Sequence, residues 1–211
     1  MRLYIKGDYT KEIPFDYLEL AKKMWFENYQ GEGIPLSYSG FLQIRDGNDI
    51  AIHLKLNKQE CDERWSKVPI QEGIKYRFYS QIDEDLNLEF ENAYVTDFRE
   101  NGDCLRLAST HLELLTLDKR AFYVMAVEIA TIFNGQISED DKKTWLTIEE
   151  FKEKHQDILS LTFEEANEMS LEEIQTIDAI DDPIWEELDK KREEYIQIHG
   201  EAELNDDEED E

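Results

Sequence analysis

The sequence predicts an α+β fold whose N-terminal half is a mostly antiparallel sheet. Three observations support this prediction. Apolar and polar residues alternate in short runs before residue 118, turn residues such as Asp-Gly separate these runs, and apolar residues recur at helical spacing after residue 118. The short turns favour antiparallel pairing of five or six strands. A core helix predicted at 119–134 would cover this sheet, and a helical acidic C-terminal region would follow.

A short strand and an amphipathic helix open the chain. The strand is expected at residues 3–5. Pro14 would open the helix, because the N–H that proline lacks has no partner in a first helical turn. Gly31 and Gly33 would end the helix. Its apolar residues recur at helical spacing: Phe15, Leu18, Ala21, Met24 or Trp25, and Tyr29.

A β-hairpin follows, with its turn at residues 46–48. This turn contains Asp-Gly, and glycine adopts positive φ at little cost. The two strands are expected at 38–45 and 49–56, and residues 59–67 would form a short helix or an ordered loop that carries Trp65. The clearest two-residue period in the chain places four apolar residues of the second strand on one face: Ile50, Ile52, Leu54 and Leu56.

A second hairpin is predicted next, with alternating strands at 74–79 and 86–91 and a turn at 83–85. The second of these strands would continue past a bulge to Phe98. Residues 101–103, Asn-Gly-Asp, would form another turn, and a further strand or a bent pair would occupy 104–117.

The main helix at 119–134 is expected to begin at Asp118 as its N-cap and to end at Asn134-Gly135. Its apolar stripe comprises Phe122, Met125, Ile129, Ile132 and Phe133. Capping boxes, in which Ser or Thr precedes Glu by three residues, predict the starts of three short helices at 148–155, 163–168 and 171–176. The boxes are Thr147/Glu150, Thr162/Glu165 and Ser170/Glu173.

The end of the chain is strongly acidic. A last helix is predicted from Asp182-Pro183 to about Ile198, and residues 201–211 are expected to be a disordered acidic tail. We therefore expect an α+β domain at 1–160, an acidic helical extension at 161–200 that packs on the same domain or stands apart from it, and the tail.

The negative charge is concentrated in the second part of the chain. Residues 1–120 hold 16 Lys and Arg against 22 Asp and Glu, whereas residues 121–211 hold 7 against 29. The formal net charge of −28 thus divides into −6 and −22. A small domain needs a net charge of only about 2–8 for solubility. The excess favours a basic macromolecular partner, since charge steers association.

Composition also disfavours several classes of protein. The two cysteines, Cys61 and Cys104, form no disulfide or metal framework, which favours reduced thiols. The chain has no apolar run of transmembrane length and no signal-peptide pattern at its start, so a cytoplasmic protein is expected. Direct binding to nucleic acid or to a membrane is disfavoured, because both require basic surfaces.

No motif predicts catalytic residues, metal ligands or a cofactor, and the chain is not expected to be an enzyme. Asp83, Asp85 and Asn87 begin like a calcium loop, but Leu88 and Tyr94 stand where such a loop has Gly and Glu. Neither cysteine has a flanking motif. The four histidines match no zinc spacing: His53, His111, His155 and His199.

Two tryptophans lie in acidic surroundings and are the candidate anchors for a partner, since aromatic residues often dominate binding energy at interfaces. The alternative is that both anchor short helices in the core. The predicted partner-binding residues are Asp140, Asp141, Trp145, Glu172, Glu173, Asp181, Asp182, Trp185, Glu186 and Glu187.

The segment Asn134-Gly135-Gln136-Ile137-Ser138-Glu139-Asp140-Asp141, followed by Thr144-Trp145-Leu146-Thr147-Ile148-Glu149-Glu150-Phe151, resembles a segment of small bacterial proteins. Some of these are immunity proteins of polymorphic toxin systems. In them a helix ends at Gly, a short strand and an acidic turn follow, and then come a Trp and a capped helix. The resemblance implies a cytosolic protein that binds and neutralises a toxin, and it assigns no site residues.

These observations predict an acidic binding protein that inhibits a basic partner, such as a nuclease toxin or another nucleic-acid-binding protein. The sequence leaves two alternatives open. One is a DNA mimic, whose carboxylates would be spaced like phosphates. The other is an adaptor that binds a peptide at a sheet edge or an apolar groove, with acidity serving solubility only. The oligomeric state is not predicted.

Overall fold

A computed structural model of the protein describes residues 1–14, 16–26, 35–42, 50–68, 84–95, 98–111 and 113–176. Contacts group Met1–Ile177 into one compact unit and Asp178–Glu211 into a second. The predicted helix at 182–198 and the predicted tail lie outside the described residues, as do the predicted turn at 46–48 and the predicted strand at 74–79.

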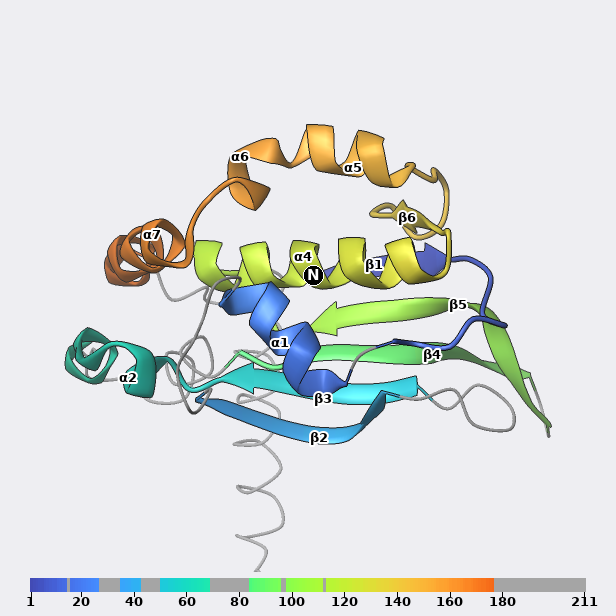
Figure 1. The fold of residues 1–211 in the computed structure, drawn as a ribbon, viewed down its shortest axis with the longest axis horizontal. Coiled ribbons are helices and arrows are strands. Elements are labelled where there is room, and N and C mark those ends of the chain that lie inside the picture. The colour runs from blue at the N-terminus through green and yellow to red at the C-terminus, as the bar shows by residue number, and fades with distance from the viewer. Residues whose placement is uncertain are drawn as a thin grey trace, which may run out of the picture. The chain divides into compact units, whose positions relative to one another are not determined.

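Six strands form one antiparallel sheet in the order β2–β3–β4–β5–β1–β6 (Figure 1). This confirms the predicted α+β fold with its antiparallel sheet. β1 pairs with β5 on one side and with β6 on the other. The strands are β1 (Arg2–Lys6), β2 (Leu36–Leu42), β3 (Ile50–Leu56), β4 (Leu86–Val95), β5 (Phe98–Ser109) and β6 (Gln136–Ser138).

The long helix α4 (Thr116–Ile132) lies over the sheet together with α1 (Tyr17–Trp25), as predicted for the core helix (Figure 1). The predicted alternation in β3 is confirmed, because Ile50, Ile52 and Leu54 are buried in the core beneath these helices. Leu56 is buried in the same way. Burying such side chains contributes about 1.5–3 kcal/mol each.

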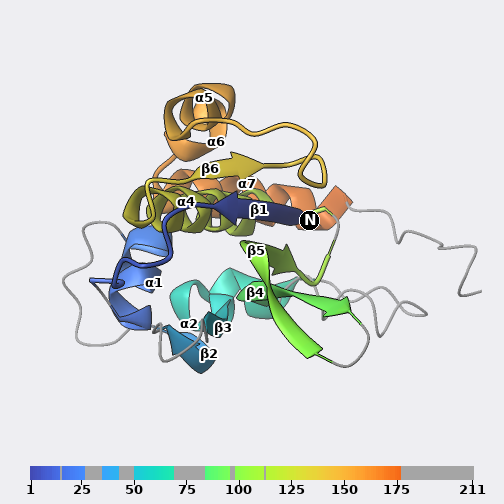
Figure 2. The same ribbon diagram turned by 90° about the vertical axis from the view of Figure 1, so that its right-hand side faces the viewer.

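α4 is enclosed on several sides. It contacts α1, β1 and three further helices: α5 (Ile148–Lys154), α6 (Gln156–Leu159) and α7 (Phe163–Thr176). Figure 2 shows α5 and α6 on the side of α4 that faces away from β2, β3 and β4. Twelve of its 17 residues are consequently buried. A helix that is buried nearly all round is typical of the centre of a core.

The β4–β5 hairpin differs from the prediction. The predicted turn at 101–103 is wrong, because β5 continues through these residues and Asn101 pairs with Asn92. The pairing shifts between Phe90 and Asn92, opposite the Gly-Asp of the predicted turn, so this turn signal marks a bulge. The predicted pairing of 74–79 with β4 involves residues outside the described ranges. Residues 86–89 of β4 pair with β3 on one edge and with β5 on the other.

Two predicted helix starts are corrected. Asp16, not Pro14, begins α1: its carboxylate accepts the backbone N–H groups of Leu18 and Glu19, and Glu19 reaches back in a capping box. Leu18, predicted to be on the apolar face of this helix, is 36% exposed, whereas Leu20 is buried. The N-cap of α4 is Leu115, whose side chain caps nothing, and Asp118 lies within the first turn.

The capping boxes at Thr147 and Thr162 are confirmed, since each pairs reciprocally with its Glu and α5 and α7 begin directly after them. The third box is wrong. Ser170 lies inside the continuous helix α7, so the two predicted helices at 163–168 and 171–176 are one. The predicted segment 59–67 forms α2 (Lys58–Cys61) and the 3-10 turn η1 (Glu63–Lys67). Within the described ranges, every helix is too short or too polar to span a bilayer.

Candidate partner-binding surface

Five of the ten predicted partner-binding residues are described, and they lie in two groups. Asp140, Asp141 and Trp145 belong to the segment between β6 and α5, whereas Glu172 and Glu173 lie near the C-terminal end of α7. The structure does not describe Asp181, Asp182, Trp185, Glu186 and Glu187.

The carboxylate of Asp140 holds the turn after β6. The hydroxyl and backbone N–H of Thr144 donate to it at 2.6 and 2.8 Å, and the Ser138 hydroxyl donates at 2.9 Å. These bonds stabilise the charged form and lower the pKa of Asp140 to about 2. Asp141 and Lys142 adopt left-handed φ values of 54° and 68°, and both are exposed. Asp140 thus has a structural role that its exposed neighbour Asp141 lacks.

The half-buried Trp145 already has a cationic neighbour. The Nζ of Lys6 lies 4.3 Å from the ring centroid of Trp145, and the Nζ of Lys142 lies 5.0 Å from that of Tyr4. A cation over an aromatic face is held by the charge distribution of the ring. The Trp145 ring is therefore already occupied on one side by Lys6 of the same chain.

Glu173 and Ser170 cap the start of α4 from another helix. The backbone N–H of Thr116 donates to Oε2 of Glu173 at 2.8 Å, and the Thr116 hydroxyl donates to Oε1 at 2.5 Å. The backbone N–H of Leu117 donates to the Ser170 hydroxyl at 2.8 Å. These N–H groups have no partner within α4, and its own N-cap side chain supplies none. The positive end of the helix dipole also favours the Glu173 carboxylate.

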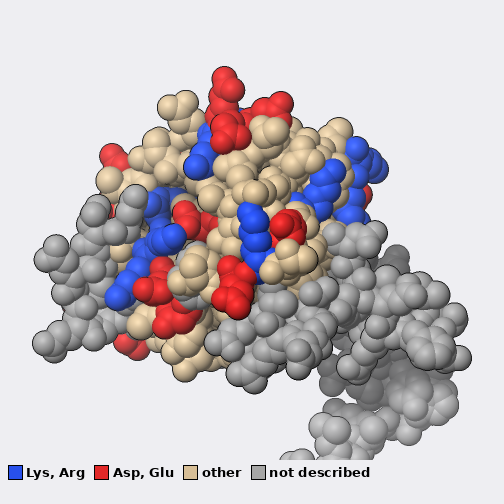
Figure 3. All heavy atoms as spheres, turned by 45° about the vertical axis from the view of Figure 1, so that its right-hand side comes forward, with Lys and Arg blue, Asp and Glu red and all other residues tan. Residues whose placement is uncertain are grey.

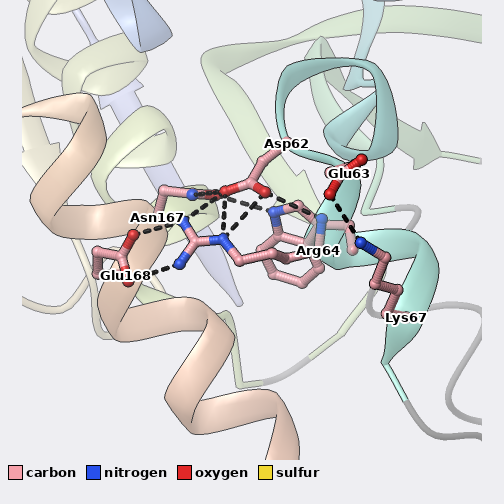
Figure 4. Close-up of polar contacts among 7 residues, drawn as sticks. Asp62, Glu63, Arg64, Lys67, Asn167 and Glu168 are labelled. Carbon is pink, nitrogen blue, oxygen red and sulfur yellow. Dashed lines mark hydrogen bonds and ion pairs between the residues drawn. The ribbon is translucent and has the colours of Figure 1, made fainter.

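A second set of polar contacts joins α7 to η1 (Figure 4). The guanidinium of Arg64 bridges Asp62 and Glu168, with an Nη1–Oε2 distance of 2.9 Å to Glu168. Asn167 accepts the indole N–H of Trp65 at 2.8 Å and donates to Asp62 at 2.8 Å. The Arg64 side chain holds the pKa of Asp62 well below its usual range and also lowers that of Glu168.

We call these contacts of α7 with η1 and with the first turn of α4 the α7 junction. Its apolar part is small and separate from the main core. It consists of the buried residues Trp65, Leu115, Leu171 and Ile174, with Val68 packed against them.

A buried ion pair lies beside this junction. The Nζ of Lys58 is 2.8 Å from Oδ2 of Asp118, and the two side chains are only 1% and 2% exposed. Burial raises the pKa of Asp118 to about 6, against the opposite effect of Lys58. The nearby Glu84 is also buried, where it pairs with His111 and accepts the backbone N–H of Thr110 at 2.6 Å.

This pair was not predicted from the sequence. Asp118 was predicted to be a helix cap, although it stands four residues before Phe122 and therefore shares the apolar face of the helix. That position was the available signal for burial. No local pattern connects Asp118 with Lys58, which lies on a different helix.

The described charges are least balanced in one short stretch. Figure 3 shows acidic and basic residues interspersed on one face of the molecule. Residues 156–176, by contrast, contain six acids and no base. Glu164, Glu168 and Glu172 recur every fourth residue, so they share one side of α7, and all three are exposed. We call these three residues the α7 acidic stripe.

A hollow of about 300 Å³ lies between α7 and the end of η1. Leu171, Glu168 and Glu172 line it from α7, and Arg64, Lys67 and Val68 line it from the other side. Two of the lining residues thus belong to the α7 acidic stripe. Arg64 is paired with Asp62 and Glu168, and the Nζ of Lys67 lies 2.7 Å from Oε1 of Glu63. Within the described chain, Glu172 alone of the charged lining residues has neither a hydrogen-bond nor an ion-pair partner.

His155 and the two cysteines, all within the described residues, are packed into the fold. The Nε2 of His155 lies 2.7 Å from Oε1 of Glu139, and the imidazole packs against the rings of Tyr123 and Phe151. Cys104 is buried, and burial raises the pKa of the Cys61 thiol to about 12, which disfavours the nucleophilic thiolate. Across the ranges that the structure describes, His, Cys, Asp and Glu form no group suited to a metal ion.

No protein-family model, curated protein or solved structure matches this chain.

Proposed function

We propose that this protein is an acidic binding protein that inhibits a basic macromolecular partner in the cytoplasm, in the manner of a toxin immunity protein. The observation that supports this most directly is the stretch 156–176, where six acids occur without a base. Three of its carboxylates are exposed and have no described partner: Asp157, Glu164 and Glu172.

The proposed mechanism is electrostatic capture followed by close contact. Carboxylates on α7 attract a basic surface and orient it during the encounter, which raises the association rate. The sequence of residues 178–211 adds 16 acids against 3 bases to the charge of the whole chain. The protein then acts by occupying the partner's surface, without chemistry of its own.

Affinity capture tests this proposal. The full chain is immobilised, extracts of its natural host are passed over it at low and high salt, and retained proteins are identified by mass spectrometry. We expect one basic protein to be retained at low salt and released at high salt, because screening weakens exposed charge pairs. The absence of a salt-sensitive basic partner contradicts the proposal.

A matched pair of variants then tests the surface. Asp157→Asn with Glu164→Gln removes two exposed charges from the proposed site. Glu12→Gln with Glu113→Gln removes two exposed charges elsewhere in the same unit. We expect the first variant alone to reduce the association rate with the retained protein and to flatten its salt dependence. An equal effect of both variants would attribute binding to net charge only.

The protein retained in the affinity capture also separates the two alternatives. Competition between duplex DNA and this chain for the retained protein would support a DNA mimic. Retention that does not respond to salt would support a peptide-binding adaptor.

A further inference from the structure

The hollow between α7 and η1 combines an apolar floor with an acidic wall. Leu171 is buried at its base within the small apolar cluster, and Val68 packs against that cluster from the opposite side. A volume of about 300 Å³ lies at the lower limit of small-molecule sites, which span roughly 300–1,000 Å³. The hollow is therefore suited to one side chain of a partner.

The charges around the hollow favour a cation. Its two lysine and arginine residues are already neutralised, Lys67 by Glu63 and Arg64 by Asp62 and Glu168. With Glu172 included, four carboxylates surround two cations, which leaves a net charge of −2. Of the charged groups that the structure describes at the hollow, the Glu172 carboxylate is the one without a partner.

We propose that this hollow receives an arginine side chain of the basic partner. The inference rests on the proposed function and names the contact that would anchor the partner. The methylene stem packs on Leu171 and Val68, and the guanidinium donates to Glu172. Arginine suits this arrangement because its planar guanidinium binds a carboxylate through two parallel hydrogen bonds and is weakly hydrated.

The test is an NMR titration of the ¹⁵N-labelled full chain with the peptide acetyl-Gly-Arg-Gly-amide. The control peptide carries citrulline, which keeps the shape of arginine and lacks its charge. We expect saturable shifts in the amides of residues 64–68 and 171–175 with the arginine peptide only. Equal shifts with the citrulline peptide, or no shifts in these two segments, would overturn the inference.

Three variants locate the binding. Glu172→Gln is expected to weaken the arginine peptide roughly fivefold, because a neutral hydrogen bond replaces a charge-assisted one. Glu12→Gln removes an exposed charge far from α7 and outside the hollow, and it is expected to leave affinity unchanged. Gln175→Trp alters an exposed residue that lines the hollow, and we expect the larger side chain to block it. Equal weakening by the two glutamate variants contradicts a specific pocket.

The captured partner distinguishes the two proposals. If affinity capture yields no basic partner, the proposed function fails whatever the peptide titration shows. If a basic partner is captured equally well by the wild type, Glu172→Gln and Gln175→Trp, the proposed function stands and the arginine pocket is rejected.

Discussion

The main core and the α7 junction are held together in different ways. In the core, β3, β5, α1 and α4 bury continuous apolar surface, and the energy depends on area rather than direction. At the junction, four buried apolar residues are accompanied by directed polar contacts from Asn167, Glu168, Ser170 and Glu173. One compact unit thus contains an apolar part, stabilised by buried area, and a second part whose geometry is specified by hydrogen bonds and charge.

The largest effect is expected from a cavity in the main core. Phe122 of α4 is fully buried, so Phe122→Ala is expected to lower the free energy of unfolding by about 3–5 kcal/mol. Urea denaturation followed by circular dichroism and by tryptophan fluorescence measures this loss. Both probes should shift together if the core stabilises the whole unit. If only one probe shifted, the core would not stabilise the whole unit, and the contrast between core and junction would fail.

The next effect concerns the buried ion pair. Lys58→Met leaves the Asp118 carboxylate buried without its partner and is expected to cost about 3–5 kcal/mol. The double variant Lys58→Met with Asp118→Leu removes both charges and should recover most of this loss. Urea midpoints of the two variants give the comparison. A double variant no better than the single one would show that the pair itself, not the isolated charge, stabilises the fold.

Loss of the cap that α7 provides should be smaller and local. Glu173→Ala with Ser170→Ala removes the acceptors for the N–H groups of Thr116 and Leu117, at about 1 kcal/mol per cap. Hydrogen exchange should show reduced protection in α7 and the first turn of α4, with β3 to β5 unaffected. Glu172→Gln, which removes a neighbouring charge without a cap, is the control. An equal loss of hydrogen-exchange protection across the sheet would show that the junction does not open independently of the core.

The smallest effect is expected from acid. The pKa values of Asp62 and Glu168 are lowered in the folded protein, mainly by hydrogen bonds from Arg64, so the unfolded chain binds more protons. Their contribution is present above their usual pKa values near 4 and is lost as pH falls below them. Protection factors in α7 should therefore decrease between pH 5 and about 3 before those of the sheet, and Arg64→Met should remove most of this dependence.

Asp118 responds to acid in the opposite direction. Its pKa is raised in the folded state, so protonation below about pH 6 favours folding. The difference in the free energy of unfolding between wild type and Asp118→Asn should become more positive as pH falls from 7 to 5. The opposite trend would show that Lys58 dominates this pair.

Local patterns predicted the elements of this fold well where burial follows one period. The alternation in 50–56 identified β3 because one face of that strand is buried. The helix at 119–134 was found within a few residues of its bounds for the same reason. Local patterns failed where a side chain forms hydrogen bonds with a helix that is distant in the sequence. Ser170 and Glu173 have the spacing of a capping box, yet they cap a helix that begins more than fifty residues earlier.

The candidate surface was predictable only in part. The excess of acids can be counted from the sequence, because counting requires no knowledge of contacts. Composition does not distinguish a free carboxylate from one that the fold already uses. Asp140 and Glu173 are engaged within the chain, whereas Glu172 has no hydrogen-bond or ion-pair partner among the described residues. That distinction depends on which segments meet in space, as does the hollow beside Glu172.

The position of β1 in the sheet has a consequence for synthesis. Of the six strands, β1 is made first, yet Arg2 pairs with Ala108 of β5 and Tyr4 pairs with Ser138 of β6. Pairing across such distances in the chain requires closing long loops and slows folding. The ribosome must therefore complete most of this unit before its first strand has either neighbour. A nascent chain that stalls before β5 leaves both edges of β1 open to pairing with other chains.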